Sequence, residues 1–453
     1  MHERLPGFRD FYPEDCAKRN FLFRVWSDAA RCHGFHEYDI PTLEPLNLFT
    51  EKSGPEIVSQ LFNFTDKGGR EVALRPELTP SLARMVGAKV ASLPKPLKWF
   101  NIAENFRYEK PQEGRLRSHY QLNCDIFGEP GPGADAELIA TAIASIRSFG
   151  PTEKDFVVRL SDRTLWMLFL ASLGHEGEAA LGVLGVIDKL ERLPREQALE
   201  RLTPYFGDAR EDFFAQVETI LSLRDAPSLA TFFLGHAPNA DLRAKIEGRL
   251  AEWTTLLENL RAMGLGPFIR VDLGIVRGLA YYTGFVFEIF KLDADGTLSG
   301  RALAGGGRYD HLIGKLGFPE TPAVGFGMGD VTMTQFLEER GCLPKMIEKP
   351  DVFVVLGGGE ARTLGLAAVG ALRSAGIRTE YPLREVGFGK QFRLAGQSGA
   401  RLALIVGENE AARHQIRVKD LTSGGEVGIF ASHAVEAIRA FLDEGIPPTD
   451  SPS

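Results

Sequence analysis

The stretch that decides the fold is NFRYEKPQEGRLRSHYQLNCD, residues 105–125. Alternation along its second half places Gln121, Asn123 and Asp125 on one face of a predicted strand. Arg107 lies on the preceding strand, and arginine suits phosphate and carboxylate because its planar guanidinium is always charged. The stretch therefore predicts either a polar binding floor, with an arginine-bearing loop closing over a polyphosphate, or an ordinary antiparallel hairpin with a solvated charged face.

A second stretch that carries chemistry is ALRPELT, residues 73–79. Here a predicted strand runs into a turn that ends in Glu77 and Thr79, and a carboxylate and a hydroxyl at this spacing suit an ammonium group. The alternative is a helix start in which Thr79 is the N-cap before Pro80. Such caps are common, so the spacing alone leaves both interpretations open.

Two glycine-rich stretches lie further along the chain. The first, GIVRGLAYYTG at residues 274–284, places glycines around Arg277 and the pair Tyr281 and Tyr282. Backbone can therefore approach a ligand closely while these side chains reach it. The second, within residues 304–330, contains AGGGRYD and GFGMGD. Glycine clusters alone are weak signals of phosphate binding, and neither a P-loop nor a Rossmann motif is present.

Composition indicates a large globular chain. Its 453 residues are roughly three times the usual size of one domain, and 44% hydrophobic with 25% charged residues is typical of globular proteins. A net charge of −8 argues against a protein that coats polyanions, although a local basic patch is compatible with RNA. The cysteines and histidines are scattered, so we expect neither a disulfide framework nor a fixed metal site. The start of the chain lacks a secretory signal and no long apolar run follows, so we expect a cytoplasmic protein without a membrane span.

A helical pattern rich in Leu, Ala, Glu and Arg interrupts the strand-like texture of the chain. We therefore predict a sheet domain over residues 1–330 with a helical insertion at about 163–262. A linker over 331–350, a mostly parallel α/β domain over 351–445 and a disordered tail over 446–453 complete the prediction. Within the α/β domain we predict strands at 352–356, 378–381 and 402–406 and helices at 361–374, 390–396 and 433–442.

These stretches, in this order, resemble the class II aminoacyl-tRNA synthetases, and among them the histidine-specific members. PGFRDFYP at residues 6–13 resembles their amino-terminal signature, and residues 34–44 resemble motif 1 of the dimer interface. Residues 106–125 resemble motif 2, and residues 276–282 resemble an element peculiar to histidine-specific members. Residues 351–445 are similar to the anticodon-binding domain. The resemblance implies an α+β catalytic domain with an antiparallel sheet and helices, a helical insertion, and a C-terminal α/β anticodon-binding domain.

The resemblance also implies the reaction and its partners. The enzyme would form histidyl-adenylate from L-histidine and ATP and transfer histidine to tRNA(His). It would act as a homodimer in the cytoplasm, with Mg²⁺ bound to ATP and with no tightly bound cofactor or fixed metal. In motif 1, Phe35, Tyr38 and Ile40 would provide the apolar surface of the dimer.

Residue roles follow from the same resemblance. Arg107 and Arg277 would be catalytic, because fixed arginines stabilise charge that develops on phosphate oxygens. Histidine would be bound by Glu77, Thr79, Arg107, Gln121, Asp125, Arg277, Tyr281 and Tyr282. ATP would be bound by Arg107, Glu109, Arg115 and Arg308.

Two positions depart from the family pattern. Ala280 takes a place where the family often has Asp, and Thr332 takes the place of an ATP-binding arginine in motif 3. Either another basic group such as Arg308 substitutes, or the chain is a histidine-binding paralogue that resembles the regulatory subunit of ATP phosphoribosyltransferase and does not charge tRNA. Such regulators typically lack the anticodon-binding domain, so residues 351–445 favour the enzyme. A purely RNA-binding module fits less well, because this region has eleven Lys and Arg against eleven Asp and Glu.

Overall fold

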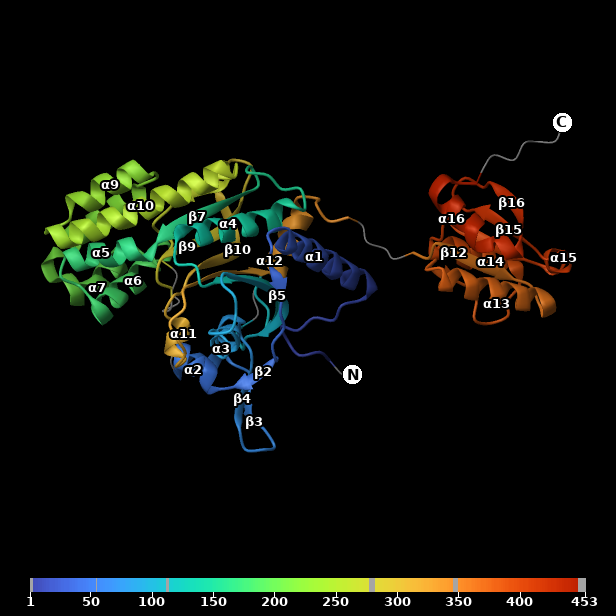
Figure 1. The fold of residues 1–453 in the computed structure, drawn as a ribbon, viewed down its shortest axis with the longest axis horizontal. Coiled ribbons are helices and arrows are strands. Elements are labelled where there is room, and N and C mark those ends of the chain that lie inside the picture. The colour runs from blue at the N-terminus through green and yellow to red at the C-terminus, as the bar shows by residue number, and fades with distance from the viewer. Residues whose placement is uncertain (1–2, 54, 111–113, 277–281, 345–348, 447–453) are drawn as a thin grey trace. The chain divides into compact units, whose positions relative to one another are not determined.

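The computed structural model divides into two compact units, Met1–Lys345 and Met346–Ser453, and each unit is described by itself (Figure 1). The described residues are 3–53, 55–110, 114–276, 282–344 and 349–446. The predicted linker over 331–350 is wrong at its start, because Asp330–Glu339 form helix α12, which packs in the first unit. The predicted tail over 446–453 lies outside the described residues except for its first position.

An eight-stranded sheet forms the centre of the first unit. Its strand order is β1-β5-β6-β11-β10-β9-β7-β8. Neighbouring strands are antiparallel, except that β1 runs parallel to β5 and β7 parallel to β8. This antiparallel-rich sheet confirms the predicted fold class. The strands are β1 (His36–Glu37), β5 (Leu97–Phe106), β6 (Ser118–Phe127), β7 (Phe156–Asp162), β8 (Ile269–Val271), β9 (Phe285–Leu292), β10 (Leu298–Arg308) and β11 (Ala323–Gly329).

Helices cover one face of this sheet. Even-numbered positions of β6, such as Leu122 and Cys124, are fully buried and share one core with three helices. Trp26 and Ile143 fill this core from two of the helices and Phe336 from the third. Period-two alternation thus assigns the even side chains of β6 to packing and leaves the odd ones on the opposite face. The three helices are α1 (Pro13–Cys32), α4 (Pro132–Arg147) and α12 (Asp330–Glu339).

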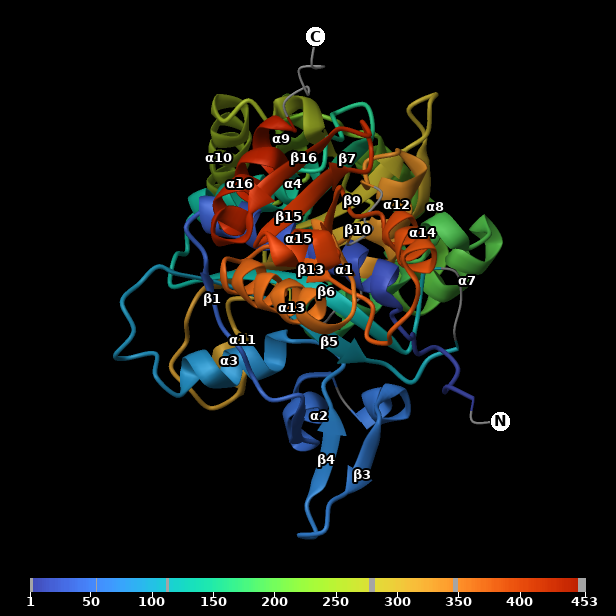
Figure 2. The same cartoon turned by 90° about the vertical axis from the view of Figure 1, so that its right-hand side faces the viewer.

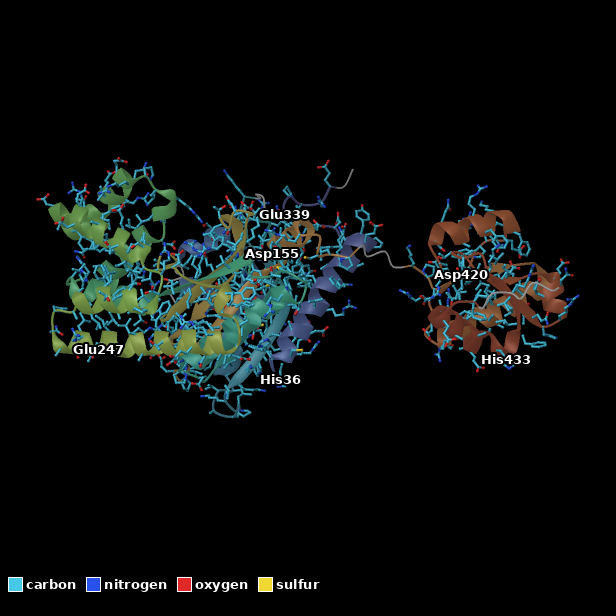
Figure 3. All side chains as sticks on the ribbon, turned by 90° about the horizontal axis from the view of Figure 1, so that it is seen from above. His36, Asp155, Glu247, Glu339, Asp420 and His433 are labelled. Carbon is cyan, nitrogen blue, oxygen red and sulfur yellow. The ribbon has the colours of Figure 1, made fainter. Side chains whose placement is uncertain are left out.

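Six helices are inserted between β7 and β8 and gather beside the sheet (Figure 1). Asp162, the last residue of β7, starts the insertion because its carboxylate caps α5 through the backbone N–H groups of Thr164 and Leu165. Glu247 marks the last of these helices in Figure 3. The helices are α5 (Arg163–Ser172), α6 (Gly177–Ile187), α7 (Arg195–Phe206), α8 (Arg210–Ser222), α9 (Ala226–Gly235) and α10 (Ala240–Ala262).

A small sheet with the order β2-β4-β3 completes the first unit. Its β3–β4 hairpin projects from the rest of the unit in both ribbon views (Figures 1 and 2). Three short helices accompany it. The elements are β2 (Leu43–Pro45), β3 (Asn63–Thr65), β4 (Glu71–Leu74), α2 (Asn47–Ser53), α3 (Thr79–Gly87) and α11 (Leu312–Lys315). Throughout the described part of the chain, none of the helices combines the length and the apolar character needed to cross a membrane.

The residues of motif 1 differ from the sequence prediction. Phe35, Tyr38 and Ile40 are 2%, 7% and 6% exposed within a single chain. They pack in the cores of their own unit rather than on its surface. The prediction that they provide an apolar dimer surface is therefore wrong, and the strand itself is only two residues long.

The second unit is a five-stranded sheet with helices. Its order is β13-β12-β14-β15-β16, and only the first three strands are mutually parallel. The predicted strands at 352–356 and 402–406 are confirmed, whereas the antiparallel β15–β16 hairpin was not predicted. The strands are β12 (Val352–Leu356), β13 (Thr379–Glu380), β14 (Leu402–Val406), β15 (Gln415–Asp420) and β16 (Glu426–Phe430). The helices are α13 (Gly359–Ser374), α14 (Phe388–Ser398), α15 (Glu408–Ala412) and α16 (Ala434–Glu444).

Candidate functional site

The face of β6 that points away from α1, α4 and α12 carries a row of polar side chains over a strip of glycines. Gln121 and Asp125 point from β6 across β11, where Gly325 pairs with Asp125. A Cβ atom on Gly325 would lie 1.9 Å from Asp125 Oδ1, and one on Gly327 would lie 2.0 Å from Gln121 Nε2. Only glycine leaves room for these side chains at both positions. The glycines of the GFGMGD stretch therefore shape the polar row of β6.

Asp125 occupies the closed end of this row. Its carboxylate is 2% exposed, and Oδ1 accepts a hydrogen bond of 2.5 Å from the hydroxyl of Tyr309. Tyr282 is buried in the same cluster, and a Cβ atom on Gly307 would lie 3.0 Å from its ring. Burial, followed by the charge of Asp125, raises the pKa of Tyr38 well above its usual value, so this phenol stays neutral. No role was predicted for Tyr309, which lies two residues after the glycine run.

The neighbouring polar groups keep capacity for a ligand. Asn101, Asn105 and Asn123 each have a buried amide oxygen without a hydrogen-bond partner among the described residues. Asn105 Nδ2 donates to Gln121 Oε1 at 3.0 Å, which holds the Gln121 amide in place. Buried polar atoms normally have hydrogen-bond partners, so these oxygens could accept hydrogen bonds from a bound molecule.

The turn after β4 meets the end of β5. The backbone N–H of Phe106 donates to Arg75 O at 2.9 Å, and Arg107 Nε donates to Pro76 O at 3.1 Å. The half-buried Glu77 and Arg107 thus lie at the same end of the polar row. Thr79 is buried as the first residue of α3, so the alternative of a helix start is confirmed, with Leu78 rather than Thr79 as the N-cap.

The loop between β5 and β6 is braced by the start of the chain. The backbone N–H groups of Arg117 and Ser118 both donate to Gly7 O, at 3.0 and 3.2 Å. Arg9 binds Asp330 at the start of α12 with a distance of 2.7 Å between Nη2 and Oδ2. Residues of the amino-terminal signature therefore hold the base of this loop. At its far end, the exposed Arg115 forms an ion pair with Glu109.

His119 lies at the open end of the polar row, two residues before Gln121. Burial, together with the charges of Arg107, Arg9 and Arg115, lowers its pKa to about 3. The imidazole is therefore neutral near pH 7, although several arginines surround it. His119 was not predicted from the sequence, because a lone histidine in a strand has no distinctive pattern.

Arg308 does not have the surroundings predicted for an ATP ligand. It is 4% exposed, and Nη2 donates to Asp135 Oδ2 at 2.5 Å and to Gly131 O at 3.0 Å. Nη1 donates to Glu129 O and Asp310 Oδ1 at 3.0 and 3.2 Å. These partners fasten β10 to the start of α4. The prediction that Arg308 binds ATP is therefore corrected to a structural role.

The other residues singled out in the sequence lie partly within and partly outside the described part of the chain. Tyr282 belongs to the same buried cluster as Tyr309, which binds Asp125. Arg277, Ala280 and Tyr281 lie outside the described residues. Gln121 and Asp125 form the polar row itself. The open end of this row is surrounded by Glu77, Arg107, Glu109 and Arg115. The arrangement thus combines a row of buried polar side chains with arginines at its open end, which suits a small zwitterion beside a phosphate chain.

Comparisons with known proteins agree with this geometry. Residues 7–330 match the family model of histidyl-tRNA synthetase, and residues 351–441 match the model of an anticodon binding domain. A histidine–tRNA ligase from Opitutus terrae is 49% identical over 440 residues, which cover 97% of this chain and 98% of that protein. One from Leptospira biflexa is 37% identical and covers 98% of both chains. The crystal structure of histidyl-tRNA synthetase from a Nostoc species has the same fold, with a TM-score of 0.75 at 24% identity over 97% of this chain and 99% of that chain. This chain belongs to the histidyl-tRNA synthetase family.

Proposed function

We propose that this chain ligates L-histidine to tRNA(His) in two steps. A carboxylate oxygen of histidine attacks the α-phosphorus of ATP, the bond to pyrophosphate breaks, and histidyl-adenylate forms. A terminal ribose hydroxyl of the tRNA then attacks the activated carbonyl and releases AMP. The observation that carries this proposal is the polar row of Gln121 and Asp125 over the glycine strip, with Arg107 at its mouth.

The histidine pocket follows from the chemistry of the ligand. Asp125 Oδ1 already accepts from Tyr309, and a carboxylate can accept further hydrogen bonds, so it suits an imidazole N–H. Glu77, Thr79 and Gln121 would bind the ammonium group of histidine. Tyr282 and Tyr281 would contact the ring. Tyr281 keeps this role by the family resemblance alone.

Arginines would hold the reacting phosphate. Arg107 and Arg277 would stabilise the negative charge that develops on the α-phosphate oxygens, and Arg277 keeps this role by the family resemblance alone. Glu109 and Arg115 would bind the distal part of ATP, which enters with Mg²⁺ as part of the substrate. No side chain acts as a nucleophile, so positioning of the two substrates has to provide much of the rate acceleration.

Histidine-dependent exchange between ATP and pyrophosphate tests this function directly. The purified chain should exchange label only when histidine is present and should then charge tRNA(His). Binding of histidine without exchange would instead support the regulatory paralogue. The match of residues 351–441 to an anticodon binding domain argues against that alternative and supports tRNA as a partner. A tRNA-charging enzyme would act where its tRNA is, in the cytoplasm.

We also propose a homodimer, on a different basis from the buried motif 1 residues. Leu43 and Phe64 are 40% and 50% exposed. Their pairing with Leu74 and Val72 places both on one face of the small sheet. Exposed apolar side chains that share one face are typical of an interaction surface.

The dimer is tested by light scattering at micromolar concentration. Wild-type protein should have twice the monomer mass, and Phe64→Glu should shift the mass toward the monomer because it buries a charge in the interface. Phe430→Glu, at an exposed phenylalanine of the second unit, is the control. A monomeric mass for the active wild type would contradict the proposal.

A further inference from the structure

The first helix of the insertion, α5, is bound to the chain directly after Tyr282. The hydroxyl of Thr164 on this helix donates to Thr283 O at 2.8 Å. The backbone N–H of Arg163 donates to Gly284 O at 3.0 Å. Two consecutive carbonyl groups are therefore held by the start of α5. The residue proposed to contact the ring of histidine is thus followed at once by two bonds to the insertion.

Thr283 is also bound from the side of the sheet. Its backbone N–H donates to Arg308 O, at the end of β10, at 2.8 Å. Its hydroxyl donates to Asp310 Oδ2 at 3.1 Å and accepts from the backbone N–H of Asp310 at 3.2 Å. Together with the bond from Thr164, these contacts use the N–H, the carbonyl and the hydroxyl of Thr283. The backbone that follows Tyr282 is therefore fixed from two elements at once.

The same helix binds the chain ahead of this stretch. Trp166 of α5 is fully buried, and its Nε1 donates to Leu273 O at 2.9 Å. The preceding residue, Asp272, binds Arg159 of β7 with a distance of 2.7 Å between Oδ2 and Nε. Among the described residues, α5 and the strand that leads into it thus hold the chain both before and after the glycine-rich stretch.

Helix α5 is itself fixed at its first turn. Its cap, Asp162, is fully buried, and Oδ2 accepts from Arg249 Nε at 2.6 Å and from Trp253 Nε1 at 2.7 Å. Both donors belong to α10, the last helix of the insertion. Hydrogen bonds that involve a charged group are stronger than neutral ones. The first and last helices of the insertion therefore set the position of Thr164 together.

Tyr282 belongs to the buried part of the proposed histidine site. It is 6% exposed and shares a core cluster with Tyr309, which binds Asp125 at 2.5 Å. A Cβ atom on Gly307 would lie 3.0 Å from the ring of Tyr282, so this ring packs directly on the backbone of β10. Closely packed interiors transmit small displacements. The position of the ring therefore depends on the position of the backbone at Thr283.

We propose, on the basis of the proposed histidine ligation, that Thr164 is a positioning residue for recognition of the amino acid. Its hydroxyl holds the carbonyl of Thr283 and thereby keeps the ring of Tyr282 where the imidazole of histidine binds. The insertion thus takes part in amino-acid recognition through one hydroxyl group, without a residue of its own in contact with histidine.

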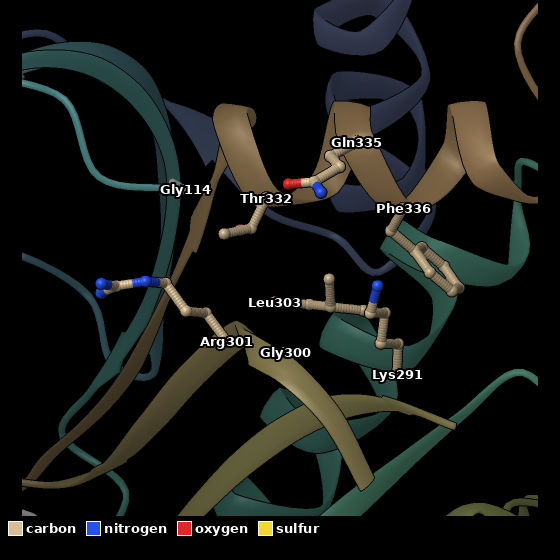
Figure 4. A pocket seen from close by; sticks show the side chains of 8 residues that line it. All are labelled: Gly114, Lys291, Gly300, Arg301, Leu303, Thr332, Gln335 and Phe336. Atoms are coloured by element: carbon tan, nitrogen blue, oxygen red, sulfur yellow. The ribbon is translucent and has the colours of Figure 1, made fainter. Parts of the chain in front are cut away.

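The ATP side of the proposed site shares no described residue with these contacts. Figure 4 shows a pocket of about 380 Å³ between the start of β10 and the first turns of α12, and Gly114 is part of its lining. Gly114 directly precedes Arg115, which is proposed to bind the distal part of ATP. None of the described residues that line this pocket belongs to α5 or to the stretch that carries Tyr282. Loss of the Thr164 hydroxyl should therefore weaken binding of histidine and leave binding of ATP unchanged.

Thr164→Val tests this assignment, because it replaces the hydroxyl by a methyl group and keeps the shape of the side chain. The KM for histidine in pyrophosphate exchange and the Kd of histidine by calorimetry should both rise roughly 3–10-fold, the range for losing one neutral hydrogen bond. The KM for ATP should stay nearly constant. Thr164→Ser keeps the donor and should restore the affinity for histidine. Thr141→Val is the control, because its hydroxyl bond of 2.8 Å to Glu137 O stays within α4, and it should change neither constant.

A double-mutant cycle with Tyr282→Leu tests the route of the effect. If Thr164 acts through the ring of Tyr282, Thr164→Val should reduce the affinity for histidine little further once that ring is absent. Thermal melting of each variant shows that it is folded. Fully additive losses of affinity would show that Thr164 acts by another route and would overturn the assignment.

The remaining outcomes separate this assignment from the proposed function. Unchanged histidine affinity in Thr164→Val, with or without a lower melting temperature, would overturn the assignment and leave the proposed function standing. Equal rises of both KM values would also overturn it. Wild-type protein that binds histidine without histidine-dependent exchange would reject the proposed function, while the Kd values of the variants would still decide the role of Thr164. Wild-type protein that binds no histidine would reject both.

Discussion

The carboxylate of Asp125 is buried at the closed end of the polar row, where its Oδ1 accepts a hydrogen bond of 2.5 Å from Tyr309. Asp125→Asn keeps the volume but replaces acceptors by an amide that also donates. The mismatch with an imidazole N–H should cost about 1–3 kcal/mol of histidine binding. We therefore expect the KM for histidine to rise while the KM for ATP stays nearly constant in pyrophosphate exchange. Equal changes in both constants would indicate a folding defect instead.

The neutral His119 predicts a dependence of stability on pH. Its pKa is lowered to about 3 in the folded chain, mainly by burial, whereas an unfolded histidine has a pKa near 6.5. As pH falls from about 6.5 toward 3, His119 binds a proton in the unfolded state but not in the folded state. The free energy of unfolding therefore decreases over this pH range. At pH 5 this amounts to about 2 kcal/mol for such a shift.

His119→Phe removes the titrating group and keeps a ring of similar size. The difference in unfolding free energy between variant and wild type should move in favour of the variant as pH decreases from 7 to 5. Urea unfolding at several pH values measures this difference. A difference that is constant with pH would contradict a neutral, half-buried His119.

At the scale of elements, β11 has alternating glycines because the side chains of Gln121 and Asp125 on β6 occupy the space that Cβ atoms would fill. Gly325→Ala would place its Cβ 1.9 Å from Asp125 Oδ1, so the Asp125 side chain has to rotate away. Alanine suits a strand interior at least as well as glycine, so the strand itself should persist. We expect a strong loss of histidine binding with a melting temperature within a few degrees of wild type. Gly428→Ala in β16 has open space at its Cβ and serves as the control.

Elements with strong local patterns were predictable from the sequence. β12 and β14 are buried on both faces and read as unbroken apolar runs, so their bounds were predicted correctly. β15 and β16 lie toward one edge of that sheet, and β16 has no buried residue, which left little apolar signal. The polar row of β6 could be predicted because side chains alternate between the two faces of a strand, and this alternation depends only on neighbouring residues. The bond between Tyr309 and Asp125 joins residues 184 positions apart, and only the folded sheet brings them together.

At the scale of the whole molecule, each hydrophobic core lies within one of the two units of the chain. Among the described residues, the clusters around Leu122 and Phe127 belong to the first unit, and those around Val354 and Val355 belong to the second. Each unit therefore has its own core and should fold alone. The residues proposed to bind histidine and ATP all belong to the first unit.

A chain ended after Lys345 separates the two steps of the proposed reaction. It should keep histidine-dependent pyrophosphate exchange close to the wild-type rate, because the polar row and its arginines are intact. Charging of tRNA(His) should fall roughly 10–100-fold, since stacking and phosphate contacts worth about 1–3 kcal/mol each are lost with the second unit. That unit exposes Phe388 and Phe392 one helical turn apart on α14, and aromatic side chains suit stacking with unpaired bases. Loss of exchange in a truncated chain that still melts cooperatively would show that adenylation needs the second unit, contrary to this expectation.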